Sequence, residues 1–218
     1  MSASSSNASR RRELLAWAGT IGAVTAEALG EREQGAASAR ARLAAAERKG
    51  LMSVWRLVRD PPALYTVTRA GLRAGGVPDL EPARVSAAGA AHAAACCAAA
   101  VRLESAYPGY AVLGEPAIRA ACRGAERPFA CPRLRTGSGE RTHRPDLVLV
   151  PKRGGLPIAV EVELTVKAPE RLQAICRAWA RERTVAGVLY IAPPEVQRAL
   201  ARAMTRTGAS EKLLVLDL

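Results

Sequence analysis

Residues 141–173, RTHRPDLVLVPKRGGLPIAVEVELTVKAPERLQ, decide the fold of the C-terminal half of the chain. Apolar residues alternate with others from Ile158 to Val166, which is the period-two pattern of a β-strand, and LVLV precedes them as a second apolar run. The linking stretch PKRGGLP is rich in Gly and Pro and predicts a hairpin turn. The sequence therefore predicts strands at 145–151 and 156–166, followed by a helix at 169–183.

Three acidic residues stand inside this apolar segment: Asp146, Glu161 and Glu163. The strand period places both glutamates on one face. A turn at Arg153-Gly154 pairs Asp146 with Glu161, and a turn at Gly154-Gly155 pairs it with Glu163. Either register puts Asp146 on the face of the glutamates, where cross-strand neighbours lie roughly 5 Å apart.

Carboxylates at that spacing repel unless a proton or a cation lies between them. Oxygen ligands of this kind suit a divalent metal, Mg²⁺ or Mn²⁺, with Asp146 and Glu161 as the candidate ligands. The alternative is structural: the glutamates would lie on the solvated face of an edge strand, paired with Arg144 or Lys167.

The rest of the C-terminal half alternates strands and helices and predicts an α/β domain with a mixed sheet over residues 86–218. It begins with an Ala-rich helix and includes a loop of uncertain structure at 119–142. The remaining predicted elements are a helix at 86–106, strands at 109–114, 186–192 and 212–217, and a helix at 193–207.

The N-terminal part predicts a different domain. Residues 1–9 are small and polar and predict a disordered start, and residues 76–85 carry Gly, Pro and Ser without periodicity and predict a linker. Between them, three helices and a two-stranded hairpin follow one another over 10–75, the order of a winged helix-turn-helix. Thr25 is the expected N-cap of the second helix.

The third of these helices carries alternating small and basic residues. Ala39, Leu43 and Ala46 share its inward face, while Arg40 and Arg48 line the opposite face and suit the major groove of DNA. Arg56 and Arg59 of the hairpin are expected near phosphates. A solvated charged face is the alternative, because Glu47 lies in the same turn as Arg48.

The net charge of +12 and the sequence pI near 10.4 favour a polyanionic partner, with DNA or RNA before a membrane. Arg177 and Arg181 form a stripe on the predicted helix 169–183 that suits a nucleic-acid backbone.

Cysteine usage and the N-terminal arginines bear on localisation. Five cysteines without framework spacing favour a reducing, cytoplasmic compartment, and Cys122, Cys131 and His143 are more readily explained as packed residues than as zinc ligands. The stretch 9–30 resembles a twin-arginine export signal but is too short to span a membrane, and its apolar spacing favours an amphipathic helix.

The order of helix, strand, strand with Pro145-Asp146, strand with Glu161-Val162-Glu163 and helix resembles the PD-(D/E)xK nuclease superfamily. More closely, the winged helix with ALYTVTRAGL, AAHAAA, HRPDLVLV and AVEVELTVKAPERL is similar to actinobacterial members of the replication-relaxation family. The resemblance covers about residues 10–205. It implies strand acids that hold magnesium, with a helix acid, Glu104 or alternatively Glu115, completing the shell.

The same resemblance implies a DNA-binding protein of a mobile genetic element that acts in plasmid replication or mobilisation. Its implied partners are DNA and relaxosome or replication proteins. A second copy of the chain is a further candidate partner, because the apolar strands at 186–192 and 212–217 either complete the sheet or extend it across a dimer. The alternatives are a Mg²⁺-dependent endonuclease or nickase using Asp146, Glu161, Glu163 and Glu104, and a winged-helix transcriptional regulator.

The sequence departs from the nuclease pattern at one position. Where that pattern has lysine, two residues after its acid, this chain has Glu163. Lys167 follows roughly 13 Å further along an extended strand and reaches the acids only if the chain bends. Since that lysine helps to stabilise charge in the transition state, we expect DNA binding without cleavage.

Overall fold

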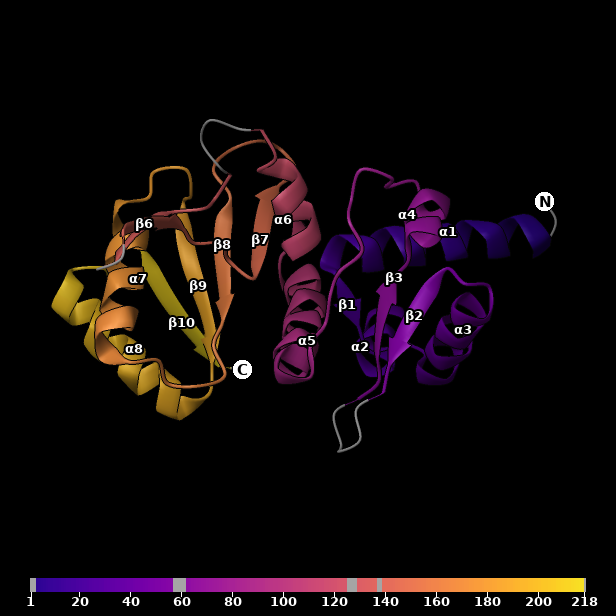
Figure 1. The fold of residues 1–218 in the computed structure, drawn as a ribbon, viewed down its shortest axis with the longest axis horizontal. Coiled ribbons are helices and arrows are strands. Elements are labelled where there is room, and N and C mark those ends of the chain that lie inside the picture. Colours follow the sequence, from indigo (N-terminus) through magenta and orange to yellow (C-terminus); the bar gives the residue numbers. More distant parts are fainter. Residues whose placement is uncertain (1–2, 57–61, 125–128, 137–138, 218) are drawn as a thin grey trace. The chain divides into compact units, whose positions relative to one another are not determined.

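The computed structural model describes residues 3–56, 62–124, 129–136 and 139–217. The chain forms two compact units, one made of Met1–Ala106 with Leu113–Ala120, the other of Tyr107–Val112 with Ala121–Leu218. Helices and strands are mixed in both, so the predicted α/β class is confirmed (Figure 1). No helix among the described residues is both long enough and apolar enough to cross a bilayer.

The first unit has the element order predicted for a winged helix-turn-helix, and β1, β3 and β2 form a three-stranded antiparallel sheet in that order. Its elements are α1 (Ala3–Ile21), β1 (Ala23–Val24), α2 (Ala26–Glu33), α3 (Ala36–Arg48), β2 (Met52–Trp55), β3 (Leu64–Val67), α4 (Arg69–Gly75), a 3₁₀ turn (Ala87–Gly89) and α5 (Ala90–Ala106).

Local sequence explains the helix-turn-helix. The Thr25 hydroxyl caps α2 by accepting a hydrogen bond from the amide of Ala28 at 3.1 Å, as predicted. Gln34 ends the helix in the left-handed conformation, and its amide donates to carbonyls of the last turn. Helix α3 then buries Ala39, Leu43 and Ala46, so its predicted inward face is confirmed.

The boundaries differ from the predicted ones in three places. Helix α1 begins at Ala3, so most of the stretch expected to be disordered continues the helix. The predicted linker packs onto the unit, since Val85 is buried with Ala23, Leu64 and Ala90. Helix α5 accordingly belongs to the first unit rather than starting the second, because its small side chains allow close packing on β1 and α2.

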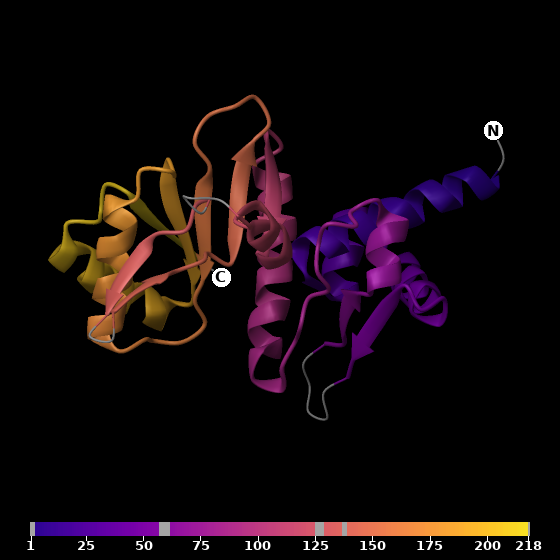
Figure 2. The same ribbon diagram turned by 45° about the horizontal axis from the view of Figure 1, so that its top comes forward.

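The second unit is built around a five-stranded mixed sheet in the order β10-β9-β8-β7-β4 (Figure 2). β7 and β8 are antiparallel, while β8, β9 and β10 are parallel, with α7 and α8 as the connections. The elements that form or follow this sheet are β4 (Tyr110–Gly114), α6 (Glu115–Ala121), β5 (Arg133–Thr136), β6 (Gly139–Thr142), β7 (Leu147–Pro151), β8 (Ile158–Val162), α7 (Pro169–Arg181), β9 (Gly187–Ala192), α8 (Pro194–Thr207) and β10 (Leu213–Asp217).

The register of the β7–β8 hairpin is the first of the two predicted. Leu147 faces Val160 and Leu149 faces Ile158, which places Asp146 opposite Glu161. The turn uses Gly154 at φ +84° and Gly155 at φ +115°, conformations that a residue with a Cβ rarely adopts.

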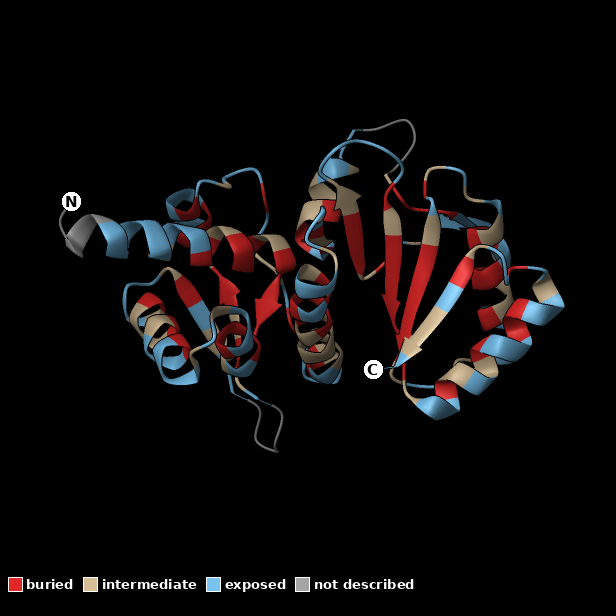
Figure 3. Ribbon diagram, turned by 180° about the vertical axis from the view of Figure 1, so that it is seen from behind, coloured by how far each residue is buried: buried red, intermediate tan, exposed pale blue. Residues whose placement is uncertain are grey.

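Two predictions for this unit need correction. β8 ends at Val162 instead of continuing to Val166, and the uncertain loop contains the hairpin β5–β6. The core lies on the central strands, while β10 at the sheet edge keeps Leu214 exposed (Figure 3).

Candidate functional site: an acidic cluster and two arginine surfaces

The predicted acids lie on or beside the central strand of the sheet. β8 lies between β7 and β9, and Glu161 and Glu163 are both 7% exposed. The part of the structural alternative that placed them on a solvated edge strand is therefore wrong, whereas the pairing with Lys167 that it also proposed is found for Glu163. Charged groups are almost never buried in this way unless they are paired, so the partners of each carboxylate decide what the cluster can do.

Asp146 is tied to the backbone of β8. Its amide donates to the carbonyl of Val160 at 3.1 Å, and its Oδ2 accepts from the amide of Val162 at 2.8 Å. Both bonds hold the carboxylate opposite Glu161, and the Asp146 charge is one of the effects that raise the pKa of Glu161.

Glu161 has two side-chain donors. Its Oε1 contacts Nε2 of His143 at 2.6 Å and accepts from the indole Nε1 of Trp179 at 2.9 Å, and the two rings are edge-to-face, 5.9 Å apart. Burial raises the pKa of Glu161, while the hydrogen bonds from His143 and Trp179 lower it. His143 and Trp179 therefore offset part of the cost of burying this carboxylate.

Glu163 forms an ion pair with Lys167, four residues later. The chain leaves the sheet after Val162, and this bend brings the ammonium group back to the acids. Burial lowers the pKa of Lys167, and the charges of Glu161 and Asp146 oppose that shift, so Lys167 lies within electrostatic reach of all three carboxylates.

Tyr190 on β9 adds a buried hydroxyl to the same site. Its backbone is in register with Glu161, and burial, followed by the charge of Glu161, raises its pKa well above the usual range. Within the described part of the chain, its oxygen is buried without a hydrogen-bond partner. A buried hydroxyl of this kind is normally satisfied by an ordered water or a bound ligand.

Glu104 and Glu115, the two candidates for a helix acid, are held in the first unit. Glu104 accepts from Nε1 of Trp17 and from Nε of Arg32, both at 2.8 Å, and Glu115 forms an ion pair with Arg119. Both carboxylates thus have cationic or indole partners within their own unit.

The predicted DNA-contacting arginines of the first unit are exposed where the structure describes them. Arg40 and Arg48 lie on the side of α3 away from its buried face, and neither has an ion-pair partner among the described residues. Arg56 pairs with Glu47 at 3.4 Å. Arg59 lies outside the described residues.

Arg177 and Arg181 are exposed on α7, one helical turn apart, where the sequence placed them. They line a pocket of about 660 Å³ together with the β5–β6 hairpin.

The thiols and His143 do not assemble into the zinc group considered from the sequence. Sγ of Cys122 and of Cys131 lie 3.5 Å apart, but the His143 imidazole is engaged by Glu161. Burial raises the pKa of Cys131 to about 12, which keeps this thiol protonated.

Sequence reasoning did not assign His143, Trp179 and Tyr190 to the acidic cluster, and it named Lys167 there only as a pairing partner in the structural alternative. Trp179 is fully buried, and its indole N–H requires an acceptor that only the fold could identify. Lys167 was set aside because β8 was expected to run on to Val166. The spacing of Glu163 and Lys167, with Pro169 close behind, is the signal that indicates an earlier end of the strand.

Comparison with protein-family models, curated proteins and solved structures found no match.

Proposed function

We propose that the protein binds duplex DNA through its first unit and acts as a DNA-binding protein of a mobile genetic element, in plasmid replication or mobilisation. The observation that carries the binding proposal is the outward face of α3. The mobile-element role rests on the resemblance to the replication-relaxation family.

Helix α3 has the composition needed to approach a DNA groove closely. Ala44 lies between Arg40 and Arg48 on the face opposite the buried one, and the helix is anchored from behind by buried Leu43. Arginine binds guanine edges and phosphates with two parallel hydrogen bonds, so unpaired guanidinium groups on a rigid helix suit both kinds of contact.

Glu47, whose position in the same turn as Arg48 favoured the alternative of a solvated charged face, has an ion-pair partner within the unit. Glu47 pairs with Arg56, so its charge acts on the hairpin arginine rather than on Arg48. Other arginines of the unit are structural: Arg42 pairs with Glu33, and Arg32 stacks on Trp17 at 4.7 Å. The contrast supports a binding role for Arg40 and Arg48.

The second unit supports binding without cleavage. Every acid of the cluster has a protein donor: Asp146 has the Val162 amide, Glu161 has His143 and Trp179, and Glu163 has Lys167. Buried carboxylates with such partners hold the central strand in place without requiring a catalytic role.

Selection from a random duplex library tests the proposal. The wild-type chain should enrich a sequence motif, and Arg40→Ala/Arg48→Ala should lose that enrichment. The control is Arg198→Ala/Arg202→Ala, which removes two exposed arginines from a different helix, α8. Enrichment by the α3 variant equal to that of the control would rule out α3 as the recognition helix.

A metal-dependent endonuclease or nickase is the second candidate function, and two observations favour it: Asp146 lies opposite Glu161, and Lys167 pairs with Glu163. The residues fit a hydrated Mg²⁺ or Mn²⁺ ion: Asp146 and Glu161 face each other, and the unpartnered Tyr190 hydroxyl is suited to a bound water. Such an ion, when bound, would activate water and stabilise charge on a phosphate.

In this second candidate, Lys167, held by Glu163, would supply the positive charge that the nuclease pattern assigns to its lysine, and His143 would orient Glu161. Calorimetry with Mg²⁺ or Mn²⁺ on the wild type and on Asp146→Ala/Glu161→Ala, beside a plasmid-nicking assay, tests it. Metal binding and nicking that both vanish in the variant would establish nuclease activity. Their absence from the wild type would refute it.

A further inference from the structure

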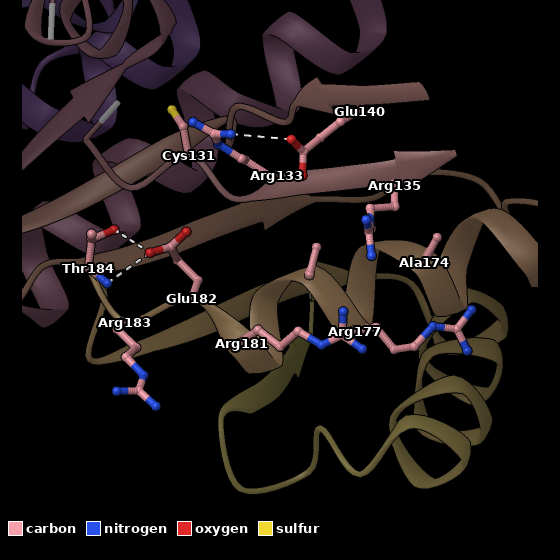
Figure 4. Close-up of a pocket in the computed structure, with 11 residues that line it drawn as sticks. Cys131, Arg133, Arg135, Glu140, Ala174, Arg177, Arg181, Glu182, Arg183 and Thr184 are labelled. Atoms are coloured by element: carbon pink, nitrogen blue, oxygen red, sulfur yellow. Dashed lines mark hydrogen bonds and ion pairs between the residues drawn. The ribbon is translucent and has the colours of Figure 1, made fainter. Parts of the chain in front are cut away.

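A second arginine-rich surface lies entirely within the second unit. It is a pocket of about 660 Å³ formed by the β5–β6 hairpin, the C-terminal half of α7 and the residues that follow it (Figure 4). Five arginines line it: Arg133, Arg135, Arg177, Arg181 and Arg183.

Most of this positive charge is not neutralised. Of the two glutamates in the lining, Glu140 pairs with Arg133 at 3.2 Å, while Glu182 accepts hydrogen bonds from the amide and hydroxyl of Thr184. Five arginines against two glutamates leave the lining with a net charge of +3. Among the described residues the other four arginines have no ion-pair partner.

Like charges held together around a hollow raise its electrostatic potential and favour an anionic ligand. Among the described residues that line the pocket there is no aromatic side chain, so these residues offer bases no stacking platform. The chemistry of the lining therefore suits phosphate groups rather than bases.

The arginines are arranged in two rows on facing elements. Arg133 and Arg135 alternate with the buried Leu134 on β5 and so repeat at about 6.6 Å. Arg177 and Arg181 on α7 repeat at about 6 Å along the helix axis. Figure 4 shows Arg135 extending from its strand towards the helix that carries the second row.

Two rows of regularly repeating guanidinium groups match a polyanion whose charges also repeat, namely the phosphates of a nucleic-acid strand. A hollow of this size admits one strand rather than both strands of a duplex. A duplex would contact the pocket only through the backbone at its surface.

We propose that this pocket binds the sugar–phosphate backbone of a single DNA strand, independently of base sequence. The inference rests on the proposed function in that it takes DNA as the ligand, but it uses a different unit and different residues. It gives the second unit a role in binding a single strand, in addition to the duplex binding proposed for α3.

The test uses the full chain and a fluorescein-labelled single strand of mixed sequence, about 12 nucleotides long, within the usual range of single-strand site sizes. Fluorescence anisotropy across a salt series compares wild type with Arg177→Ala/Arg181→Ala and with the control Arg198→Ala/Arg202→Ala. Each phosphate contact contributes about 0.7 to the slope of log K against log[salt]. In Arg177→Ala/Arg181→Ala, which removes two such contacts, the magnitude of this slope should fall by about 1.4, and the affinity at about 0.1 M salt should fall about 25-fold.

A variant that gains affinity is also needed, because a loss of binding can result from unfolding, whereas a gain cannot. Glu140→Gln releases Arg133 from its ion pair and should tighten strand binding by up to about fivefold, the effect of one added phosphate contact. Equal losses in the pocket and control variants, or no gain from Glu140→Gln, would overturn the proposal. So would displacement of the strand by ATP at concentrations below those needed for the unlabelled strand, since the pocket would then be a nucleotide site.

Duplex binding, measured on the same samples, separates this proposal from the proposed function. Duplex binding that depends on Arg40 and Arg48 without any single-strand binding refutes only the pocket. Single-strand binding that depends on Arg177 and Arg181 without duplex binding refutes only the role of α3.

Discussion

Lys167→Met should destabilise the second unit because it removes the counter-charge of a buried carboxylate. The Glu163 side chain is 10% exposed and that of Lys167 is 27% exposed. Breaking a fully buried ion pair costs about 3–5 kcal/mol. Water still reaches part of Lys167 and screens the pair, so we expect the free energy of unfolding to fall by about 2 kcal/mol. Methionine retains most of the apolar stem, so little of this loss reflects packing.

A double-mutant cycle measured by urea unfolding, followed by circular dichroism, isolates the charge effect. Glu163→Gln/Lys167→Met removes both charges and should unfold within about 1 kcal/mol of the wild type. A loss below about 0.5 kcal/mol in Lys167→Met would refute the reasoning. A double variant as unstable as Lys167→Met alone would refute it too, because the loss would then come from packing.

Two further predictions concern stability. Burial raises the pKa of Glu161 above its ordinary value of 4.5. The folded state therefore binds this proton more tightly than the unfolded state does. The free energy of unfolding contributed by this group falls as the pH rises from 4.5 through the raised pKa of the folded state. Glu161→Gln should therefore gain stability relative to wild type in urea unfolding across that window, and a difference independent of pH would contradict this; exposed Glu195→Gln is the control. Thr25→Ala removes the α2 cap and should lower the free energy of unfolding of the first unit by about 1 kcal/mol, whereas no loss would show that the cap is dispensable.

Periodicity predicted most of the fold because it reports which side chains face a core. The strict alternation around Glu161 placed β8, and the helix predicted at 169–183 is α7. The observed register of the β7–β8 hairpin is the one that a turn at Arg153-Gly154 predicts.

The unit boundary was not predictable in the same way. Helix α5 is so rich in alanine that its sequence shows no single apolar face, and its packing on β1 depends on contacts distant in the chain. The bond from Trp17 to Glu104 is an example, since the two residues are 87 positions apart.

The acidic cluster was predicted as a group of acids but not as a network. Strand periodicity located Glu161, whereas its donors His143 and Trp179 come from a loop and a helix whose approach depends on tertiary packing. The bend that brings Lys167 to Glu163 was not predicted, because a period-two pattern does not show where a strand leaves its sheet.

Duplex binding by α3 is the central claim, and the salt dependence of duplex affinity tests it most directly. Each phosphate contact contributes about 0.9 to the slope of log K against log[salt]. If Arg40 and Arg48 contact phosphates, Arg40→Ala/Arg48→Ala should reduce the slope by about 1.8 and the affinity by about 60-fold at about 0.1 M salt. Arg198→Ala/Arg202→Ala should change neither by as much. An α3 variant with the wild-type slope and affinity would contradict the account.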